Sequence, residues 1–365
     1  MMKKILYIIS TLRRSGPTNQ LYNIIKYLDK NEFDPYLVTL SPESDNSRWA
    51  DYDALGVHLY SLGLSRLRGF LCTRKEIKSF LSEIKPDVIH TQGIRADIIN
   101  TKLVKPAVSI CTARNYPYYD YPAKFGIIRG IVMANRHIAA LKKIKVIACS
   151  MAIQAQLRRH GINSFVIQNG IDISNYCLVD HNKRNDIRKK IGIEQDSFVF
   201  LAVGSLIPRK DVQTIINAFN NIKHEKKAQL IILGDGYQLK YLQNLVKNNL
   251  ILFHGNVNNV VEYLQAADVF VSSSFSEGLP NTVLEAMACG LPCLLSDIPP
   301  HKEITGETEW KFPCKDYMKL ASLMEKIQNI DTTQIGKQNR QKIENNFNAQ
   351  KMSQHYQNIY CDILR

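Results

Sequence analysis

Residues 272–297, SSSFSEGLPNTVLEAMACGLPCLLSD, combine a strand end, a polar loop and the start of a helix. An apolar run, Val269 to Val271, leads into the loop, and Pro280 opens a short helical pattern. Proline suits a first helical position because the backbone N–H that it lacks is not needed there. The unpaired backbone donors from Leu279 to Thr282 should therefore point out of the helix end, where they attract anions such as phosphate.

Two carboxylates flank this predicted anion site. Glu277 lies on the loop before the helix, and Glu285 lies in the second helical turn. Because carboxylates repel phosphate, they are better suited to accept hydrogen bonds from hydroxyl groups. A ligand with phosphates in the middle and polyols at both ends would satisfy all of these features, and nucleotide sugars have that form.

Length and composition are those of a globular protein with two domains. The chain has 365 residues, of which 45% are hydrophobic and 22% charged. Its eight cysteines form no paired CxxC set, which predicts reduced thiols in a cytoplasmic protein and argues against structural zinc. The apolar run at 1–10 is too short for a signal peptide, and no run reaches the ~18 residues that span a bilayer. We therefore expect neither export nor a membrane span.

The positive charge is concentrated in the first half of the chain. Residues 1–175 hold 25 lysines and arginines against 13 acidic residues, whereas the remainder holds 22 against 20. A basic half indicates an anionic partner, which can be nucleic acid, a membrane surface or a substrate. The alternative is that the lysines only keep the protein soluble.

Short apolar runs alternate with helical patterns, which predicts parallel sheets covered on both faces. The expected strands are 5–9, 36–40, 57–62, 88–90, 108–111, 146–149 and 165–167, then 198–203, 230–233, 251–253, 269–271 and 293–295. We expect two doubly wound Rossmann-like α/β domains, at 1–175 and 197–345, joined by a polar connector at 176–196. Residues 346–365 carry an apolar helical face and should dock back toward the first domain. The cleft between the domains is the expected site.

Basic and glycine-containing turns follow the strands of the second half. In VGSLIPRKD, Arg209 and Lys210 can clamp a diphosphate, the arginine as a planar fork and the lysine as a point charge. A solvated loop is the alternative for this pair. The LGDG turn, with Gly234 and Asp235, suits a nucleoside that approaches the backbone. The dinucleotide fingerprint GxGxxG is absent from these turns.

The motifs together resemble the retaining glycosyltransferases of family 4, which have the GT-B fold. The resemblance rests on NGID at 169–172, VGSLIPRK, ILGDG, FHGNV and EGLPNTVLEAMACGLP, and it covers nearly the whole chain. It implies an α/β protein of the GT-B fold, with two Rossmann-like domains facing across a cleft.

The resemblance also implies roles for single residues. Glu277 would contact hydroxyls of the donor sugar, Glu285 would bind the ribose diol, and Arg209 with Lys210 would hold the diphosphate. His90, in DVIHTQG, matches a recurrent family position and joins Glu277, Lys210 and Arg209 as a catalytic candidate. The other donor-binding candidates are Gly204, Ser205, Gly234, Asp235, Gly278, Leu279, Pro280, Asn281 and Glu285.

The chain departs from the family pattern at two places. Many members have arginine where Ser205 stands, so Arg209 would supply that charge alone. Many also carry a histidine in the loop after the strand at 108–111, where this chain has Arg114 and Asn115. We expect these two residues and Gly16, in the turn after the first strand, on the acceptor side. A histidine at a strand end, such as His90, is more often structural than catalytic.

Retention of configuration would follow from front-face attack, with the leaving diphosphate oxygen taking the proton of the acceptor. There is no Asp-x-Asp motif and no His/Asp set at ligand spacing, so we expect a metal-independent hexosyltransferase without a cofactor besides its nucleotide-sugar co-substrate. UDP is the expected nucleotide, by family frequency.

The basic half should receive the acceptor. The segments RLRGF and TRK within 66–75, and residues 125–145, mix apolar residues with lysine and arginine as interfacial helices do. A core helix with solvated ends is the alternative. We expect peripheral docking on the inner face of the plasma membrane and transfer of a hexose or N-acetylhexosamine to a polyprenyl-diphosphate-linked glycan. The product would be a bacterial surface polysaccharide, namely O-antigen, capsule or exopolysaccharide.

Two other classes of function explain part of the pattern. A nucleotide-sugar epimerase can share the two-domain plan, but its acid and base carboxylates have no convincing counterparts in the first half. A nucleic-acid-binding module would explain the charge, yet the basic stretches lack interleaved aromatic residues.

Overall fold

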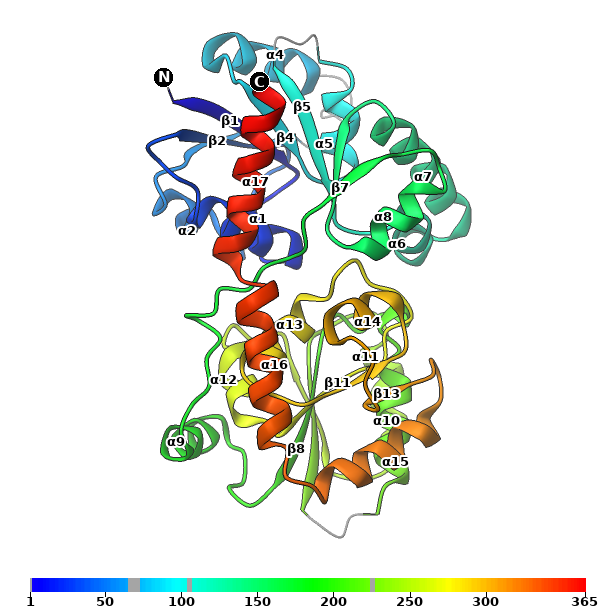
Figure 1. Ribbon diagram of the computed structural model, residues 1–365. Helices are drawn as coiled ribbons and strands as arrows, with labels where there is room; N and C mark the ends of the chain where they lie inside the picture. The colour runs from blue at the N-terminus through cyan, green and yellow to red at the C-terminus, as the bar shows by residue number, and fades with distance from the viewer. Residues whose placement is uncertain (1, 65–72, 104–106, 224–226) are drawn as a thin grey trace. The chain divides into compact units, whose positions relative to one another are not determined.

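The computed structural model describes residues 2–64, 73–103, 107–223 and 227–365, which divide into two compact units (Figure 1). Unit 1 comprises residues up to Gly170 together with Ala349–Arg365, and unit 2 comprises Ile171–Asn348. Of the predicted limits 1–175, 176–196, 197–345 and 346–365, those at 175 and 346 lie within five residues of the unit boundaries, whereas unit 2 begins at Ile171 rather than at 197. The predicted connector also belongs to unit 2.

Unit 1 is built on a parallel sheet in the order β3-β2-β1-β4-β5-β6-β7 among the described residues. The strands are β1 Lys3–Ile9, β2 Phe33–Thr39, β3 His58–Ser61, β4 Val88–Thr91, β5 Val108–Ala113, β6 Lys145–Ala148 and β7 Ser164–Val166. The helices are α1 Gly16–Lys26, α2 Trp49–Asp53, α4 Thr73–Ile84, α5 Ile94–Asn100, α6 Pro117–Phe125, α7 Ile127–Leu141, α8 Met151–Arg158 and α17 Ala349–Leu364. Every residue of β4 is buried, as expected for a central strand covered on both faces.

Unit 2 repeats this plan with the parallel order β10-β9-β8-β11-β12-β13 in its described part. The strands are β8 Phe198–Val203, β9 Ala228–Leu233, β10 Ile251–Gly255, β11 Val269–Ser272, β12 Cys293–Ser296 and β13 Lys311–Phe312. The helical segments are α9 His181–Ile191, η1 Pro208–Lys210, α10 Val212–Asn221, α11 Leu239–Gln243, α12 Val260–Ala266, α13 Asn281–Ala288, α14 Pro299–Thr305, α15 Tyr317–Gln328 and α16 Thr333–Asn346.

The predicted α/β architecture with two parallel sheets is confirmed, and the differences from the prediction are local. β2 begins at Phe33, earlier than expected, because it pairs with β1 from Lys3 onward. β13 has only two residues, too few to produce a periodic pattern in the sequence. Pro280 is the N-cap of α13, with extended backbone angles, so the first helical residue is Asn281 and the expected position of the proline was wrong by one.

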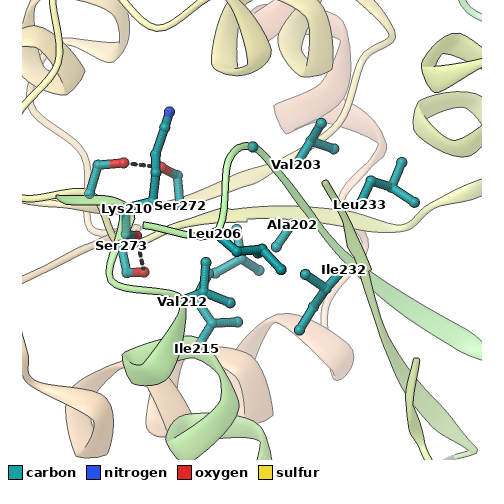
Figure 2. Close-up of a pocket in the computed structure, with 13 residues that line it drawn as sticks. Ala202, Val203, Leu206, Lys210, Val212, Ile215, Ile232, Leu233, Ser272 and Ser273 are labelled. Carbon is teal, nitrogen blue, oxygen red and sulfur yellow. Dashed lines mark hydrogen bonds between the residues drawn. The ribbon is translucent and has the colours of Figure 1, made fainter. Parts of the chain in front are cut away.

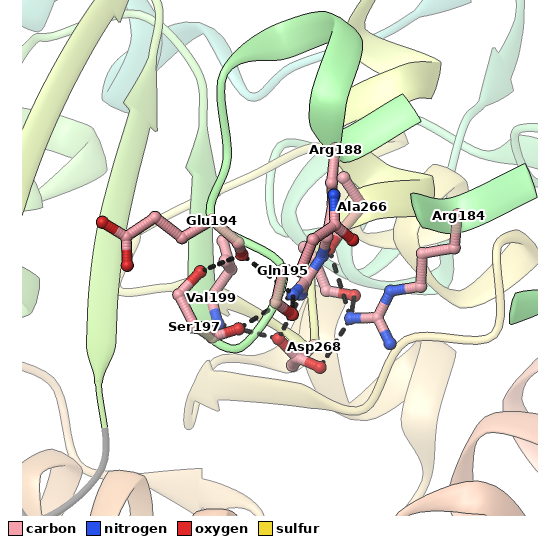
Figure 3. Close-up of polar contacts among 9 residues, drawn as sticks. Arg184, Arg188, Glu194, Gln195, Ser197, Val199, Ala266 and Asp268 are labelled. Atoms are coloured by element: carbon pink, nitrogen blue, oxygen red, sulfur yellow. Dashed lines mark hydrogen bonds and ion pairs between the residues drawn. The ribbon is translucent and has the colours of Figure 1, made fainter. Parts of the chain in front are cut away.

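Helix α9 is held against the sheet of unit 2 by a partly buried ionic cluster (Figure 3). The carboxylate of Asp268 accepts hydrogen bonds from Arg184 at 2.6 Å, from Arg188 at 2.8 Å and from the backbone N–H of Val199 at 2.8 Å. Arg188 also donates to the carbonyl oxygen of Ala266 at 2.9 Å. These contacts explain why the predicted connector folds as part of unit 2.

The last helix, α17, belongs to the core of unit 1. Met352, Tyr356 and Tyr360 are buried in the cluster that contains Ile5 and Tyr7 of β1. The hydroxyl groups of Tyr360 and Tyr7 lie 3.2 Å apart. Within the described ranges, no helix combines the length and the apolar composition required to cross a bilayer.

Candidate functional site

The site candidates of unit 2 gather where the strand order of its sheet reverses. The chain leaves β8 toward β9 on one side and returns to β11 on the other side of β8. Ligands of doubly wound sheets bind at such a switch point, beyond the carboxyl ends of the strands. Here these ends carry the loop from Gly204 to Lys210 and the loop from Ser273 to Pro280.

Glu277 forms two ion pairs at the centre of these loops. Its carboxylate accepts hydrogen bonds from Lys210 Nζ at 2.6 Å, from Arg209 at 2.9 Å and from the hydroxyl of Ser274 at 2.7 Å. Arg209 also donates to the carbonyl oxygen of Ser276. The sequence therefore placed the three charged residues in one site, but their direct pairing could not be predicted because they are 67 and 68 positions apart.

The charge of this cluster favours an anionic ligand. Burial alone would raise the pKa of Glu277, but the charges of Lys210 and Arg209 and the hydrogen bonds to the carboxylate hold it well below its usual range. Glu277 is thus ionised at neutral pH, and the two cations leave the cluster with one net positive charge. A diphosphate placed beside Lys210 and Arg209 would meet a positive field in a half-buried setting, where screening is weak.

Backbone and serine contacts hold the two loops together. The Ser273 hydroxyl donates to the carbonyl oxygen of Asp211 at 2.7 Å, and the Phe275 N–H donates to that of Arg209 at 2.9 Å. Figure 2 shows Lys210, Ser272 and Ser273 beside a small cavity of about 20 Å³, large enough for roughly one water molecule. The cations are consequently positioned by the fold rather than by a ligand.

Two glycines let the loops after β8 and β9 approach each other. A Cβ on Gly234 would lie 2.0 Å from the carbonyl oxygen of Gly204, and the φ of Gly234 is +129°. A side chain at Gly204 would instead meet Lys210 at 3.4 Å. Asp235 is exposed and accepts a hydrogen bond from the N–H of Gly236. Ser205 is also exposed, so both predicted polar residues lie at the surface of this edge.

The predicted anion-binding segment leads into α13, and Glu285 lies within that helix. Gly278, Leu279 and Pro280 are buried and lead into the helix, while Asn281 is half-buried. Glu285, one turn further on, is buried beside the hydroxyl of Tyr176, to which its carboxyl group is hydrogen-bonded. Burial raises the pKa of Glu285 to about 7, against the opposing effect of this hydrogen bond.

Among the acceptor-side candidates, Arg114 has the most defined environment. It follows β5 and donates to Asn169 at 2.7 Å and to Gln92 at 3.3 Å, which are both side-chain oxygens of unit 1. Asn115 is half-buried next to it, and Gly16 is the first residue of α1 after the N-cap Ser15. Gly16 and Arg114 therefore lie at the same, carboxyl edge of the sheet.

His90 is enclosed by protein on all sides. Its Nδ1 lies 2.8 Å from the Tyr360 hydroxyl and its Nε2 lies 2.8 Å from the Thr112 hydroxyl, and only 1% of the residue is exposed. Burial lowers the pKa of His90 to about 3, with a further contribution from the charge of Arg114. This geometry favours the structural interpretation of His90 over a catalytic one.

Four residues near the site were not singled out from the sequence. Three of them, Ser273, Ser274 and Tyr176, make the contacts given above. The fourth, His301 of α14, is buried, and the charges of Glu277 and Lys210 influence its pKa. The three-serine run was visible in the sequence, but no local signal marks Tyr176 or His301. Across the described ranges no group of three or more metal-ligating side chains occurs. The predicted basic segment at 66–75 lies outside the described residues, apart from the backbone of 73–75.

Both halves of the chain match known protein families. Residues 14–175 match the family described as Glycosyltransferase Family 4, and residues 183–349 match the family described as Glycosyl transferases group 1.

Relatives that match most of the chain are named as glycosyltransferases. The chain is 26% identical over 381 residues to the O-antigen biosynthesis glycosyltransferase WclY of Escherichia coli, covering 99% of each protein. It is 30% identical over 316 residues, 80% of each chain, to an Escherichia coli UDP-Gal:α-D-GlcNAc-diphosphoundecaprenol α-1,3-galactosyltransferase.

The fold also matches solved structures. HepE of Anabaena, solved in complex with UDP and glucose, superposes with a TM-score of 0.83 at 17% identity, covering 99% of this chain and 100% of the other. The implied GT-B fold is thereby confirmed.

Proposed function

Because the chain belongs to glycosyltransferase family 4, we propose that it is a retaining, metal-independent hexosyltransferase of bacterial surface polysaccharide synthesis. The donor is a nucleotide sugar, with UDP as the nucleotide, and the transferred group is a hexose or N-acetylhexosamine. The acceptor is an oligosaccharide linked through a diphosphate to a polyprenyl lipid, and the product is O-antigen, capsule or exopolysaccharide.

The observation that carries this proposal is the Glu277, Lys210 and Arg209 cluster at the switch point of unit 2. The cluster carries one net positive charge, its carboxylate is ionised, and it lies next to the start of helix α13. Phosphate oxygens suit the cations and the helix end, while sugar hydroxyls suit the carboxylate. Glu285, at the far side of the first helical turn, is available for the ribose hydroxyls.

We propose front-face transfer, since Glu277 is poorly suited to act as a nucleophile. Two cations and the Ser274 hydroxyl stabilise its negative charge, which lowers its basicity. The bond between the anomeric carbon and the diphosphate oxygen breaks, and the acceptor oxygen bonds to that carbon from the same face. The acceptor proton passes to the leaving diphosphate oxygen, whose developing charge Lys210 and Arg209 stabilise.

Two relatives support the choice of substrates. The Escherichia coli galactosyltransferase acts, by its name, with UDP-Gal on a diphosphoundecaprenol-linked sugar, and HepE was solved with UDP and glucose. An acceptor of this kind is anchored in a membrane, so we place the enzyme peripherally at the inner, cytoplasmic face of the plasma membrane.

Substitution of Lys210 tests the proposal. We expect Lys210→Ala to lower kcat by about 100-fold or more, because the variant loses a preorganised charge that stabilises the leaving group. Transfer is measured with UDP-hexoses and a short-chain lipid-diphosphate disaccharide, with and without EDTA, and activity should persist in EDTA. The exposed Lys319→Ala on α15 is the matched control and should retain wild-type kcat.

Three outcomes would contradict parts of the proposal. Near-normal kcat in Lys210→Ala would show that the lysine does not stabilise the leaving group. Loss of transfer in EDTA would show that the enzyme requires a metal ion. If the protein converted UDP-hexose to a different nucleotide sugar without acceptor, it would be an epimerase instead.

A further inference from the structure

The hairpin of α6 and α7 in unit 1 exposes several large apolar side chains. Ile127 and Ile128 are 72% and 81% exposed, and they lie at the turn between the two helices. We call this surface the hairpin face; its residues are Tyr119, Phe125, Ile127, Ile128, Ile131 and Val132, all at least 42% exposed. Exposed apolar residues that are scattered singly need no explanation, but a cluster of this kind on a folded protein indicates a binding surface.

The hairpin face is not the result of a loosely attached helix. The opposite side of α7 is buried, and a Cβ on Gly130 would lie 2.3 Å from the backbone nitrogen of Pro122, so α6 and α7 are in close contact. His137 of α7 lies 2.7 Å from the carboxylate of Asp97 and 2.6 Å from the Tyr121 hydroxyl. The buried side of α7 thus fixes the orientation of the helix, and Ile127 and Ile128 remain exposed to solvent.

The burial pattern of α7 bears on the two interpretations of residues 125–145, an interfacial helix and a core helix with solvated ends. The C-terminal half of α7 is a core helix, with His137, Ile138 and Leu141 buried. Its N-terminal half carries a second apolar side that the described residues of unit 1 leave exposed. The buried C-terminal half supports the core-helix interpretation, and the exposed apolar residues of the N-terminal half are those that an interfacial helix requires.

The charge around the hairpin face selects an anionic partner. Residues 121–145 contain no acidic residue, and three of their six lysines and arginines, Lys124, Arg129 and Arg136, lie on α6 and α7, whereas the other three follow the far end of α7. Arg129 and Arg136 are exposed on α7 and Lys124 is exposed at the end of α6. The nearest carboxylate in the sequence, Asp120, is buried and paired with Lys124 at 2.8 Å. Two copies of this face would bring like charges together, which disfavours a symmetric dimer.

The hairpin face also lies toward the acceptor edge of unit 1. Helix α7 connects to the amino end of β6 at Lys145, so its own N-terminus lies toward the carboxyl edge of the sheet. Arg114 lies at that edge, at the end of β5. A surface at Ile127 and Ile128 can consequently contact the layer from which a lipid-linked substrate would reach Arg114.

We propose that the hairpin face binds an anionic lipid bilayer, with Ile127 and Ile128 inserted at the boundary between headgroups and acyl chains. Arg129 and Arg136 contact the lipid phosphates around them, as in amphipathic helices that lie in the interface. The relevance of this surface to acceptor delivery rests on the proposed function, whereas the binding itself does not.

Sedimentation with vesicles tests the binding directly. Wild-type protein is mixed with vesicles of equal phosphatidylglycerol and phosphatidylethanolamine, and with pure phosphatidylcholine vesicles. We expect binding to the anionic vesicles that weakens as salt rises, and an Ile127→Ser/Ile128→Ser variant that binds at least about tenfold more weakly. The control is Met318→Ser on α15 of unit 2, where Met318 is 59% exposed, and it should bind as wild type does.

Further measurements separate the possible failures. Equal thermal unfolding of the variants shows that folding is preserved. Binding unchanged by the Ile127→Ser/Ile128→Ser substitutions, or equal binding to phosphatidylcholine, would overturn the inference, as would a wild-type dimer that these substitutions dissociate. Transfer to a water-soluble acceptor analogue should be unaffected in the variant, whereas transfer to acceptor in vesicles should fall. If no transfer occurs with any protein, the proposed function fails while the vesicle result still stands.

Discussion

Glu277 and Glu285 have the same side chain, but their surroundings shift the pKa of the two carboxyl groups in opposite directions. The ion pairs with Lys210 and Arg209 lower the pKa of Glu277, whereas burial raises the pKa of Glu285 to about 7. Among the described residues, Glu285 has no ion pair, and its carboxyl group is hydrogen-bonded to Tyr176. A buried carboxyl group without a cation lowers stability at neutral pH, so its presence beside a predicted ribose site is consistent with a role in binding.

The pH dependence of stability tests this assignment for Glu285. Below pH 4.5 the carboxyl group is protonated in both the folded and the unfolded chain. Between pH 4.5 and about 7 only the unfolded chain ionises, so the free energy of unfolding falls as pH rises, and above pH 7 the difference is constant. Glu285→Gln should therefore be more stable than wild type above pH 7, by an amount on the order of 3 kcal/mol.

Chemical denaturation at pH 4 and pH 8 measures this difference. The two proteins should be similar in stability at pH 4, and donor affinity should fall in Glu285→Gln. If Glu285→Gln were equally destabilised at both pH values, the ionised carboxyl group of Glu285 would not lower the stability of the folded protein.

At the scale of elements, helix α9 is held to the sheet of unit 2 by charge rather than by apolar packing. Its sequence, HNKRNDIRKKI, is strongly polar, and within α9 only Ile187 and Arg188 are buried. Arg188 is 4% exposed and paired with Asp268, which also accepts a hydrogen bond from the start of β8. Such a buried pair is costly to break because the remaining partner keeps an uncompensated charge.

Two arginine variants compare the buried and the exposed contact to Asp268. Arg188→Ala should lower the free energy of unfolding of unit 2 by about 3–5 kcal/mol. Arg184→Ala, whose side chain is 30% exposed, should cost about 1 kcal/mol or less. Guanidinium denaturation monitored by circular dichroism gives both values, and equal losses would argue against burial as the cause.

At the scale of the whole molecule, unit 1 is built from two separate stretches of sequence, because α17, which follows unit 2 in the chain, packs into the core of unit 1. Tyr356 and Tyr360 of α17 are fully buried, and the hydroxyl of Tyr360 reaches both Tyr7 and His90. Unit 1 therefore depends on a segment that follows unit 2 in the sequence. Unit 2, which is continuous from Ile171 to Asn348, does not.

Calorimetry of a Tyr360 variant tests this dependence. Tyr360→Ala should destabilise unit 1 by about 3–5 kcal/mol, as large-to-small changes in cores do, and should leave the unfolding of unit 2 in place. Tyr360→Phe, which keeps the ring, should cost about 1–3 kcal/mol through the lost hydrogen bonds. Equal shifts in the unfolding of both units would contradict the assignment of α17 to unit 1 alone.

The sequence by itself determined the fold class, the family and the location of the charged site. Alternating apolar runs and helical patterns are local properties, so they predicted two parallel sheets, and the motifs around Arg209, Lys210 and Glu277 predicted glycosyltransferase family 4 and its GT-B fold. The limits of single strands shifted by a few residues, and β13 was missed, because pairing with a neighbouring strand sets those limits.

Only the tertiary structure decided which partners these residues have. The pairing of Glu277 with Lys210, the contact between Tyr176 and Glu285, and the enclosure of His90 by Tyr360 join positions 67, 109 and 270 residues apart. The exposed isoleucines of α7 likewise could not be separated from core residues by sequence, because both sides of that helix are apolar. Burial and charge pairing depend on which residues the folded chain brings next to a side chain. The periodicity of a sequence does not specify these neighbours, because they come from distant positions.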